Sequence, residues 1–245
     1  MLAKVADILT GAEATIYRAL SARINYLASD RPDVAYIAKE LCRDFAHPTQ
    51  KSVERLKRTV RYLCHKPRLV WNYDYQEPCG DLTVCVDTDF AGCQETRRST
   101  SGGVMFHGRH MLKVWSKTQT TVALSSAEAE LTGICTGASQ GIGMRSMMAD
   151  LGFKWSLIMR SDAAAAIGIC KRRGLGKVRH LATADLWIQD HLRTGDFVLN
   201  KNLGTENPAD ILTKNVDKNL LTKHLVTMQL REKSGRAESA PKVDQ

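Results

Sequence analysis

The sequence predicts an α/β fold for the larger, C-terminal part of the chain, preceded by a small helical segment. Two observations carry this prediction. From about residue 80, short runs of β-like composition alternate with helical patterns, whereas residues 12–66 repeat apolar positions at helical spacing. Such alternation is typical of a sheet covered by helices. With 245 residues, 43% of them hydrophobic, the chain is long enough for one or two packed domains.

The N-terminal segment is expected to contain three helices. Two breaks that contain proline, at residues 30–33 and 47–49, separate them. In the third helix Val53, Leu56 and Val60 repeat at helical spacing, while Lys and Arg residues lie mostly on the other faces. A solvated charged face and a nucleic-acid track both account for this pattern, so both interpretations stay open.

The C-terminal part is expected to begin with three antiparallel strands, within residues 81–89, 101–108 and 110–117. A long helix should follow, from an N-cap at Ser125 or Ser126 to about Asp150, since acidic residues in its first turn suit the helix dipole.

The remaining elements alternate between strand and helix. We expect a strand at 156–162, a helix from Ala163, another helix within 180–193 and a strand at 196–204. A last helix should open near Pro208. The tail from Arg231 has almost no large apolar residue and is expected to be disordered.

Composition limits the class of protein. The net charge of +9, from 35 Lys and Arg against 26 Asp and Glu, suits a polyanionic partner, although an uncommitted basic surface is the alternative. No apolar run approaches the roughly 20 residues that span a bilayer, and the start lacks a secretory signal. We therefore expect an intracellular protein, in cytoplasm or nucleus, without a membrane partner. Seven cysteines without a CxxC pair indicate reduced thiols.

Single carboxylates recur at the ends of the predicted elements. Asp87 follows the strand TVCV, Asp162 follows LIMR, and Asp210 opens the last helix. For any one of them, a cap or a surface charge is the ordinary role, so only the set is informative. Residues at such positions can converge at one edge of a sheet, where several carboxylates form a site suited to Mg²⁺. Two such ions can support phosphodiester hydrolysis.

The start of the long helix offers two further acids. Glu128 and Glu130 lie about 160° apart around the helix axis, so one face cannot present both equally. One glutamate lies on each flank of the predicted buried stripe, and periodicity does not choose between them.

These residues stand in strings that resemble the ribonuclease H region at the end of copia-type retrotransposon Pol polyproteins. VDTDFAG, RRSTSGG, WSKTQTTVALSSAEAEL and ADILTK occur here in the family's order. Upstream, the chain resembles the segment that links the reverse transcriptase to its nuclease. The resemblance implies a ribonuclease H-like mixed five-stranded sheet with flanking helices. It divides the chain into a helical remnant of the reverse transcriptase connection (1–70), a ribonuclease H-like domain (78–216), a C-terminal helix (217–230) and a disordered tail (231–245).

The resemblance also implies a site. Its catalytic and metal-binding residues would be Asp87, Glu130, Asp162 and Asp210, holding two Mg²⁺ or Mn²⁺ ions. Alternates are Glu128, Asp89 and His180. Nucleic acid would be held by the cations Arg97, Arg98, Lys117, Lys171, Arg172, Arg173, Lys177 and Arg179.

The implied activity is hydrolysis of the RNA strand of RNA–DNA hybrids, with the reverse transcriptase portion of the same polyprotein as a partner. The chain lacks a YxDD-like polymerase turn, so it is not expected to synthesise DNA alone. Where the family has Asn-Gln-Ser after the third acid, this chain has Ala163, Ala164 and Ala165, and the stretch around His180 is rewritten. A decayed nucleic-acid-binding remnant is therefore the alternative. A nuclease of the same fold that acts on DNA alone is a third possibility.

Overall fold

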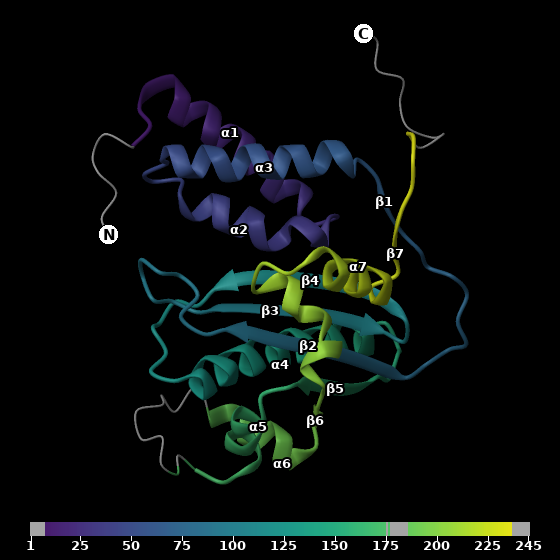
Figure 1. Cartoon of the computed structure of the whole chain (residues 1–245). Coiled ribbons are helices and arrows are strands. Elements are labelled where there is room, and N and C mark those ends of the chain that lie inside the picture. Colours follow the sequence, from purple (N-terminus) through teal and green to yellow (C-terminus); the bar gives the residue numbers. More distant parts are fainter. Residues whose placement is uncertain (1–7, 175, 177–185, 237–245) are drawn as a thin grey trace.

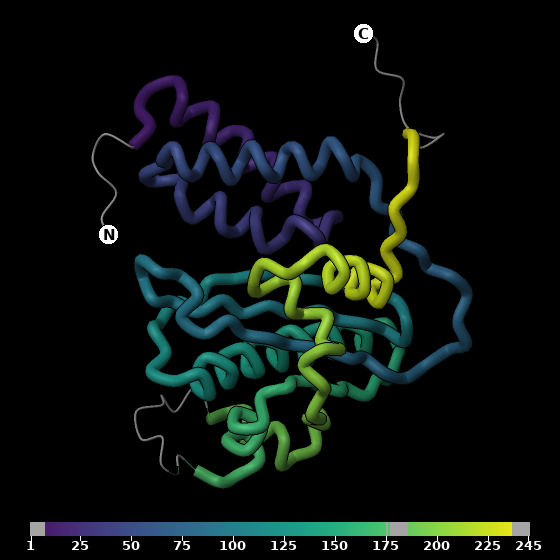
Figure 2. Tube along the Cα trace, in the orientation of Figure 1, coloured from purple at the N-terminus to yellow at the C-terminus, as the bar shows by residue number. Residues whose placement is uncertain are grey.

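The computed structural model describes residues 8–174, 176 and 186–236. A bundle of helices lies on one side of a five-stranded sheet, and further helices cover the opposite side (Figures 1 and 2). The element order confirms the predicted fold class, in which a small helical segment precedes an α/β part.

The bundle contains the three helices that the sequence predicted. Thr49 begins the third helix with a capping box, in which its side chain and that of Ser52 each accept a hydrogen bond from the other's backbone N–H. The elements of the bundle are α1 (Gly11–Leu27), the short 3₁₀ helix η2 (Pro32–Val34), α2 (Ala35–Arg43) and α3 (Gln50–His65).

The sheet has the strand order β4-β3-β2-β5-β6. The first three strands pair antiparallel, whereas β5 runs parallel to β2 and β6 parallel to β5. This confirms the predicted mixed five-stranded sheet with flanking helices. The strands are β2 (Asp81–Asp89), β3 (Thr100–His107), β4 (His110–Thr118), β5 (Ser156–Ser161) and β6 (Val198–Lys201).

The two faces of the sheet contribute to two separate cores, because successive strand residues point to opposite faces. Val84 and Val86 pack with the long helix α4 (Ser126–Asp150), whereas Cys85 between them packs with the core that includes the helical bundle. The bundle therefore shares a hydrophobic core with the sheet. The helices α5 (Ala164–Lys171) and α6 (Trp187–Thr194) extend the core on the α4 side.

Helix α4 lies close to the sheet because glycines face it. Gly133, Gly137 and Gly141 recur every four residues, and a Cβ added at any of them would come within 2.4 to 2.7 Å of a side chain of β2 or β5. Ser125 accepts a hydrogen bond from the Glu128 N–H and is the N-cap. The close approach at these glycines fixes how near the start of α4 lies to the end of β2.

Two predictions for the C-terminal region are wrong. The segment after Asn207 forms a five-residue 3₁₀ helix, η5 (Pro208–Leu212), and the α-helix α7 (Lys218–Thr227) begins only after its own N-cap, Asp217. The predicted disordered tail also begins with an ordered strand, because β7 (Leu230–Glu232) pairs antiparallel with β1 (Leu69–Trp71), while residues 237–245 of that tail lie outside the described residues. A partner that lies about 160 residues away is invisible to local composition.

A span across a membrane would need a long apolar helix, and none of the helices in the described ranges meets that requirement.

The glycine face of α4 yields a test of the packing. A Cβ at Gly137 would lie 2.5 Å from Val86 Cγ1, so Gly137→Ala should force α4 from the sheet and lower the free energy of unfolding by about 1–3 kcal/mol. Gly143 of the same helix has nothing within 4 Å of an added Cβ, so Gly143→Ala should raise stability by about 0.5–1 kcal/mol. Urea unfolding measures both, and equal effects of the two substitutions would contradict this account.

Candidate active site

The first two acids meet because Asp87 lies near the end of β2 and Asp162 directly follows the neighbouring parallel strand β5. In the register of β2 and β5, Val84 pairs with Met159 and Cys85 with Arg160. Extending this register by two residues puts Asp87 level with Asp162, at the same edge of the sheet. Gly204, in the short 3₁₀ helix η4 (Gly204–Glu206), leaves room there, because a Cβ on it would lie 2.9 Å from Asp162 Oδ2.

The third acid comes from the first turns of α4. One carboxylate oxygen from each of Asp87, Glu130 and Asp162 lies within 4.8 Å of the other two. Asp87 and Glu130 are buried, with 4% and 7% of their surface exposed. The structure thus gathers three of the four predicted acids into one compact group, the acid cluster.

Asp210, the fourth predicted acid, lies beside this cluster on η5. Asn207 fixes the segment by donating from Nδ2 to the carbonyl oxygen of Val86 (2.8 Å) and accepting from the N–H of Ala209 (3.2 Å). Thr213, which follows η5, donates a hydrogen bond from Oγ1 to Asp87 Oδ2. These contacts attach the segment of Asp210 to the end of β2.

Lys214 brings a positive charge to the site. Its Nζ lies 3.2 Å from Asp210 Oδ1 and 3.9 Å from Asp87 Oδ2. Although burial opposes the charged form, these two acids raise the pKa of Lys214 above its ordinary value. One ammonium group is therefore shared between the carboxylates of Asp87 and Asp210.

Burial is the main reason that the pKa values of all four acids are raised. The effect is largest for Glu130, whose pKa rises to about 8 through burial, with further contributions from the charges of Asp87 and Asp162. For Asp87 the hydrogen bond from Thr213 and the charge of Lys214 act in the opposite direction. The four acids therefore carry more negative charge than Lys214 compensates.

The donor set fits a divalent cation. Within the described part of the chain, Glu130 Oε2 is buried and accepts no hydrogen bond, so it is available as a ligand. Carboxylate oxygens are the ligands that Mg²⁺ and Mn²⁺ prefer. Asp87, Glu130 and Asp162 could therefore hold a metal ion.

The alternates have other surroundings. Glu128 accepts a hydrogen bond from the Leu124 N–H at Oε2 (2.7 Å), so its carboxylate caps the start of α4 instead of joining the acid cluster. Asp89 is half-buried at the end of β2. Its carboxylate lies against Gly92, where an added Cβ would collide with it. His180 lies outside the described residues.

The predicted nucleic-acid-binding cations fall on different elements. Arg97 and Arg98 are exposed in the turn between β2 and β3, and Lys117 is exposed on β4. Lys171 ends α5, where it and Arg173 are exposed and Arg172 is half-buried. Two further predicted cations, Lys177 and Arg179, lie outside the described residues.

Sequence reasoning missed Lys214, Thr213 and Asn207. The spacing of Lys214, four residues after Asp210, could have indicated an ion pair. Asn207 before Pro208 is also a recognisable helix start. No local signal connects Thr213 with Asp87, which lies 126 positions earlier.

The raised pKa of Glu130 predicts a pH dependence of stability in the absence of divalent cations. Between its ordinary value of 4.5 and about 8, the folded chain holds a proton that the unfolded chain has lost. The free energy of unfolding should therefore fall as the pH rises through this window. Glu130→Gln should make the fall shallower, as measured by urea unfolding in EDTA at a series of pH values. Glu128→Gln is the control and should keep the wild-type slope; the same slope in all three proteins would refute the assignment.

Comparison with known proteins finds similarity to transposon polyproteins. No family model matches the chain. The retrovirus-related Pol polyprotein from transposon RE1 of Arabidopsis thaliana is 28% identical over 206 residues, which cover 82% of this chain and 14% of that protein. The corresponding polyprotein from transposon TNT 1-94 of Nicotiana tabacum is 28% identical over 202 residues, covering 81% of this chain and 15% of its own length.

Among solved structures, ribonuclease H1 from the archaeon Halobacterium salinarum is similar over 55% of this chain and 95% of its own, with 17% identity and a TM-score of 0.36.

The chain spans about one seventh of the length of the curated polyproteins that it matches. Because these matches cover 82% and 81% of the chain, the chain is a homologue of the copia-type, retrovirus-related Pol polyproteins.

Proposed function

We propose that the chain is a ribonuclease H-type endonuclease that hydrolyses the RNA strand of RNA–DNA hybrids as part of a retrotransposon polyprotein. The observation that carries this proposal is the meeting of Asp87, Glu130 and Asp162 within 4.8 Å at one edge of the sheet. Buried carboxylates that repel one another are costly unless a cation compensates them. The homology to Pol polyproteins supports a nuclease role for such a site.

In this proposal Asp87, Glu130, Asp162 and Asp210 hold two Mg²⁺ or Mn²⁺ ions. When bound, such ions lower the pKa of an attacking water and stabilise the leaving oxygen. The chain's own residues prepare the site: Thr213 orients the Asp87 carboxylate, and Lys214 compensates part of the negative charge. Glu130, with its raised pKa, loses its proton when a cation binds, so binding should release protons.

The proposed substrate is recognised by shape. A hybrid can be distinguished from duplex DNA by contacts with its 2′-hydroxyl groups across a wide minor groove, so little sequence preference is expected. Exposed cations such as Arg98, Lys117 and Arg173 would contact phosphates, which position a nucleic acid without reading its bases.

A second candidate is a nucleic-acid-binding remnant that has lost its activity. The observation behind it is the run of alanines after Asp162. Ala164 and Ala165 are exposed at the start of α5, beside the acid cluster, and offer no polar atom to a substrate.

Cleavage of a labelled RNA–DNA hybrid tests the proposal. Wild-type protein should cut the RNA strand with Mg²⁺ and not in EDTA. Asp87→Asn and Glu130→Gln should each lower the rate at least a hundredfold, about 2.7 kcal/mol in activation free energy, because each removes a charged ligand. Glu128→Gln is the matched control, and it should retain most of the wild-type rate because its carboxylate lies at the helix cap.

The controls separate the rival functions. An Asp87→Asn protein as active as the wild type would refute the assignment of the site. Salt-dependent hybrid binding without any metal-dependent product would favour the remnant. Equal cleavage of hybrid and duplex DNA would show that the 2′-hydroxyl groups do not determine the substrate.

A further inference from the structure

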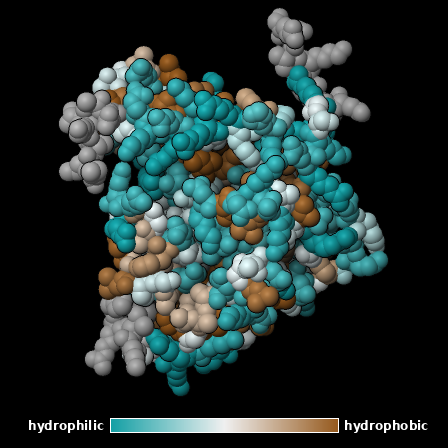
Figure 3. Space-filling model, viewed as in Figure 1, coloured by the Kyte–Doolittle hydropathy of each residue, from teal (hydrophilic) through white to brown (hydrophobic). Residues whose placement is uncertain are grey.

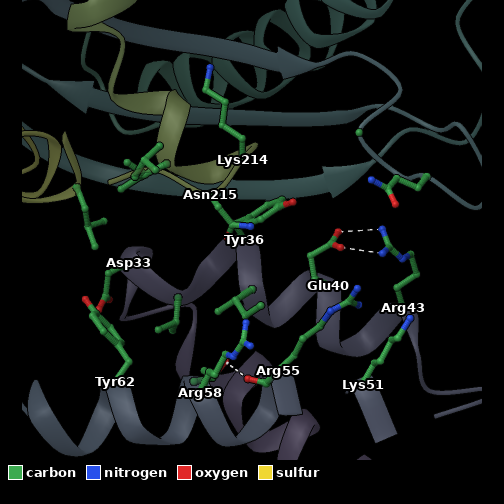
Figure 4. Close-up of a pocket in the computed structure, with 18 of the residues that line it drawn as sticks. Asp33, Tyr36, Glu40, Arg43, Lys51, Arg55, Arg58, Tyr62, Lys214 and Asn215 are labelled. Carbon is green, nitrogen blue, oxygen red and sulfur yellow. Dashed lines mark hydrogen bonds and ion pairs between the residues drawn. The ribbon is translucent and has the colours of Figure 1, made fainter. Parts of the chain in front are cut away.

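A cleft lies between the helical bundle and the segment that carries Lys214, separate from the cations predicted from sequence. Its volume is 910 Å³. Figure 4 shows residues of α2 and α3 on one wall, with Lys214 and Asn215 opposite. The charged residues that line the cleft are the cations Arg43, Lys51, Arg55, Arg58 and Lys214 and the acids Asp33, Glu40 and Glu95.

Many of the charges that line this cleft are compensated. Two of its three acids are paired, and so are the cations Arg43, Arg55 (3.3 Å from Asp44) and Lys214. The Asp33 side chain is fully buried and accepts two hydrogen bonds from Arg31, at 2.8 and 2.9 Å. Glu40 pairs with Lys39 at 2.6 Å and with Arg43 at 2.7 Å. On α3, Lys51 and Arg58 are exposed, and in the described ranges neither forms an ion pair. The cleft therefore carries unneutralised positive charge.

The cleft adjoins the acid cluster. Lys214 belongs to both, because its stem lines the cleft while its Nζ lies 3.2 Å from Asp210 Oδ1. In Figure 4 its side chain extends away from α3 toward the strands. Lys39 of α2 donates a hydrogen bond to Thr100 Oγ1 of β3 (2.8 Å), which fixes the wall of the cleft against the sheet. A polyanion held in the cleft would therefore lie beside the proposed catalytic acids.

Aromatic residues complete the lining. Tyr36 and Tyr62 are half-buried in the wall formed by α2 and α3. Cationic grooves that also present aromatic side chains are typical of single-strand binding, in which cations hold phosphates and bases stack on rings. A volume of 910 Å³ is in the range of pockets that enclose a small ligand, and so suits a few nucleotides of one strand better than a duplex.

We propose that this cleft binds a single-stranded segment of nucleic acid through its phosphates, next to the acid cluster. This rests on the proposed function only in naming the ligand as the unpaired continuation of a hybrid substrate. The cleft would hold a strand that extends beyond the paired region, and Lys51 and Arg58 would contact its phosphates.

Two double variants of α3 test the proposal. Lys51→Ala with Arg58→Ala removes two cations from the cleft. Lys57→Ala with Arg61→Ala removes the same charge from another face of the same helix, where both residues line a separate groove beside Ile16 and Leu20. All four substituted residues are exposed and lie on the same helix. The two double variants should therefore change the stability of the fold to the same small extent.

The measurement is fluorescence anisotropy with a labelled oligothymidylate of about 12 nucleotides, using the whole 245-residue chain with Asp87→Asn in EDTA so that no strand is cut. The Lys51 and Arg58 variant should lose two phosphate contacts. The slope of log K against log salt concentration should therefore fall in magnitude by about 1.4, and binding at 0.1 M salt should weaken roughly 25-fold. The Lys57 and Arg61 variant should keep the reference slope. Equal losses in both variants would overturn the proposal, and so would displacement of the strand by millimolar inorganic phosphate, which would indicate an isolated phosphate site. Because binding is measured without cleavage, an inactive nuclease could still bind the strand, and an active one could fail to bind it here.

Discussion

The structure depends on one electrostatic constraint: three carboxyl groups from three separate elements lie within 4.8 Å of one another, two of them buried. Such a group raises the free energy of the folded state unless its charge is removed or compensated. The fold does both. Glu130 takes up a proton more readily than an ordinary glutamate, while Thr213 and Lys214 stabilise the charge on Asp87. A bound cation would take the place of the proton on Glu130 and would share the Asp87 carboxylate with Thr213 and Lys214. We therefore interpret the acid cluster as a metal site and not as a structural ion-pair network.

The rest of the fold positions these groups. Parallel pairing of β2 with β5 brings Asp87 level with Asp162, and this pairing requires the long connection that α4 provides. The glycine face of α4 lets Glu130 approach the end of β2. On the opposite face of the sheet, the segment from Asn207 to Lys214 is held by hydrogen bonds to β2, and it is packed into the core that the sheet shares with the helical bundle. The bundle therefore has a role in the site although it contributes no acid to it.

Much of this could be predicted from the sequence, since the signals are local. The β-like composition of β2, the serine cap of α4 and the proline breaks of the bundle each specify an element from adjacent residues. Asp87 and Asp162 could be anticipated because each follows the apolar run of a predicted strand. Periodicity alone left Glu128 and Glu130 equivalent, and only the structure separates a helix cap from a buried ligand. The pairing of β1 with β7, the contact of Thr213 with Asp87 and the cleft depend on residues far apart in sequence, so no local pattern contains them.

A site built from acids must still admit a polyanion, and the arrangement of charge resolves this conflict. Glu130 holds a proton more readily than an ordinary glutamate and Lys214 compensates part of the remaining charge, which weakens the repulsion of a polyanion. The exposed cations of the cleft attract a polyanion over a Debye length of about 10 Å. Lys214 lies where the two regions meet, and its ammonium group is shared between Asp210 and Asp87. A divalent ion at the acid cluster would compete with Lys214 for these carboxylates and leave its charge available to a phosphate. Metal binding and strand binding would then favour each other, because the ammonium group of Lys214 cannot neutralise the carboxylates and a phosphate of the strand at once.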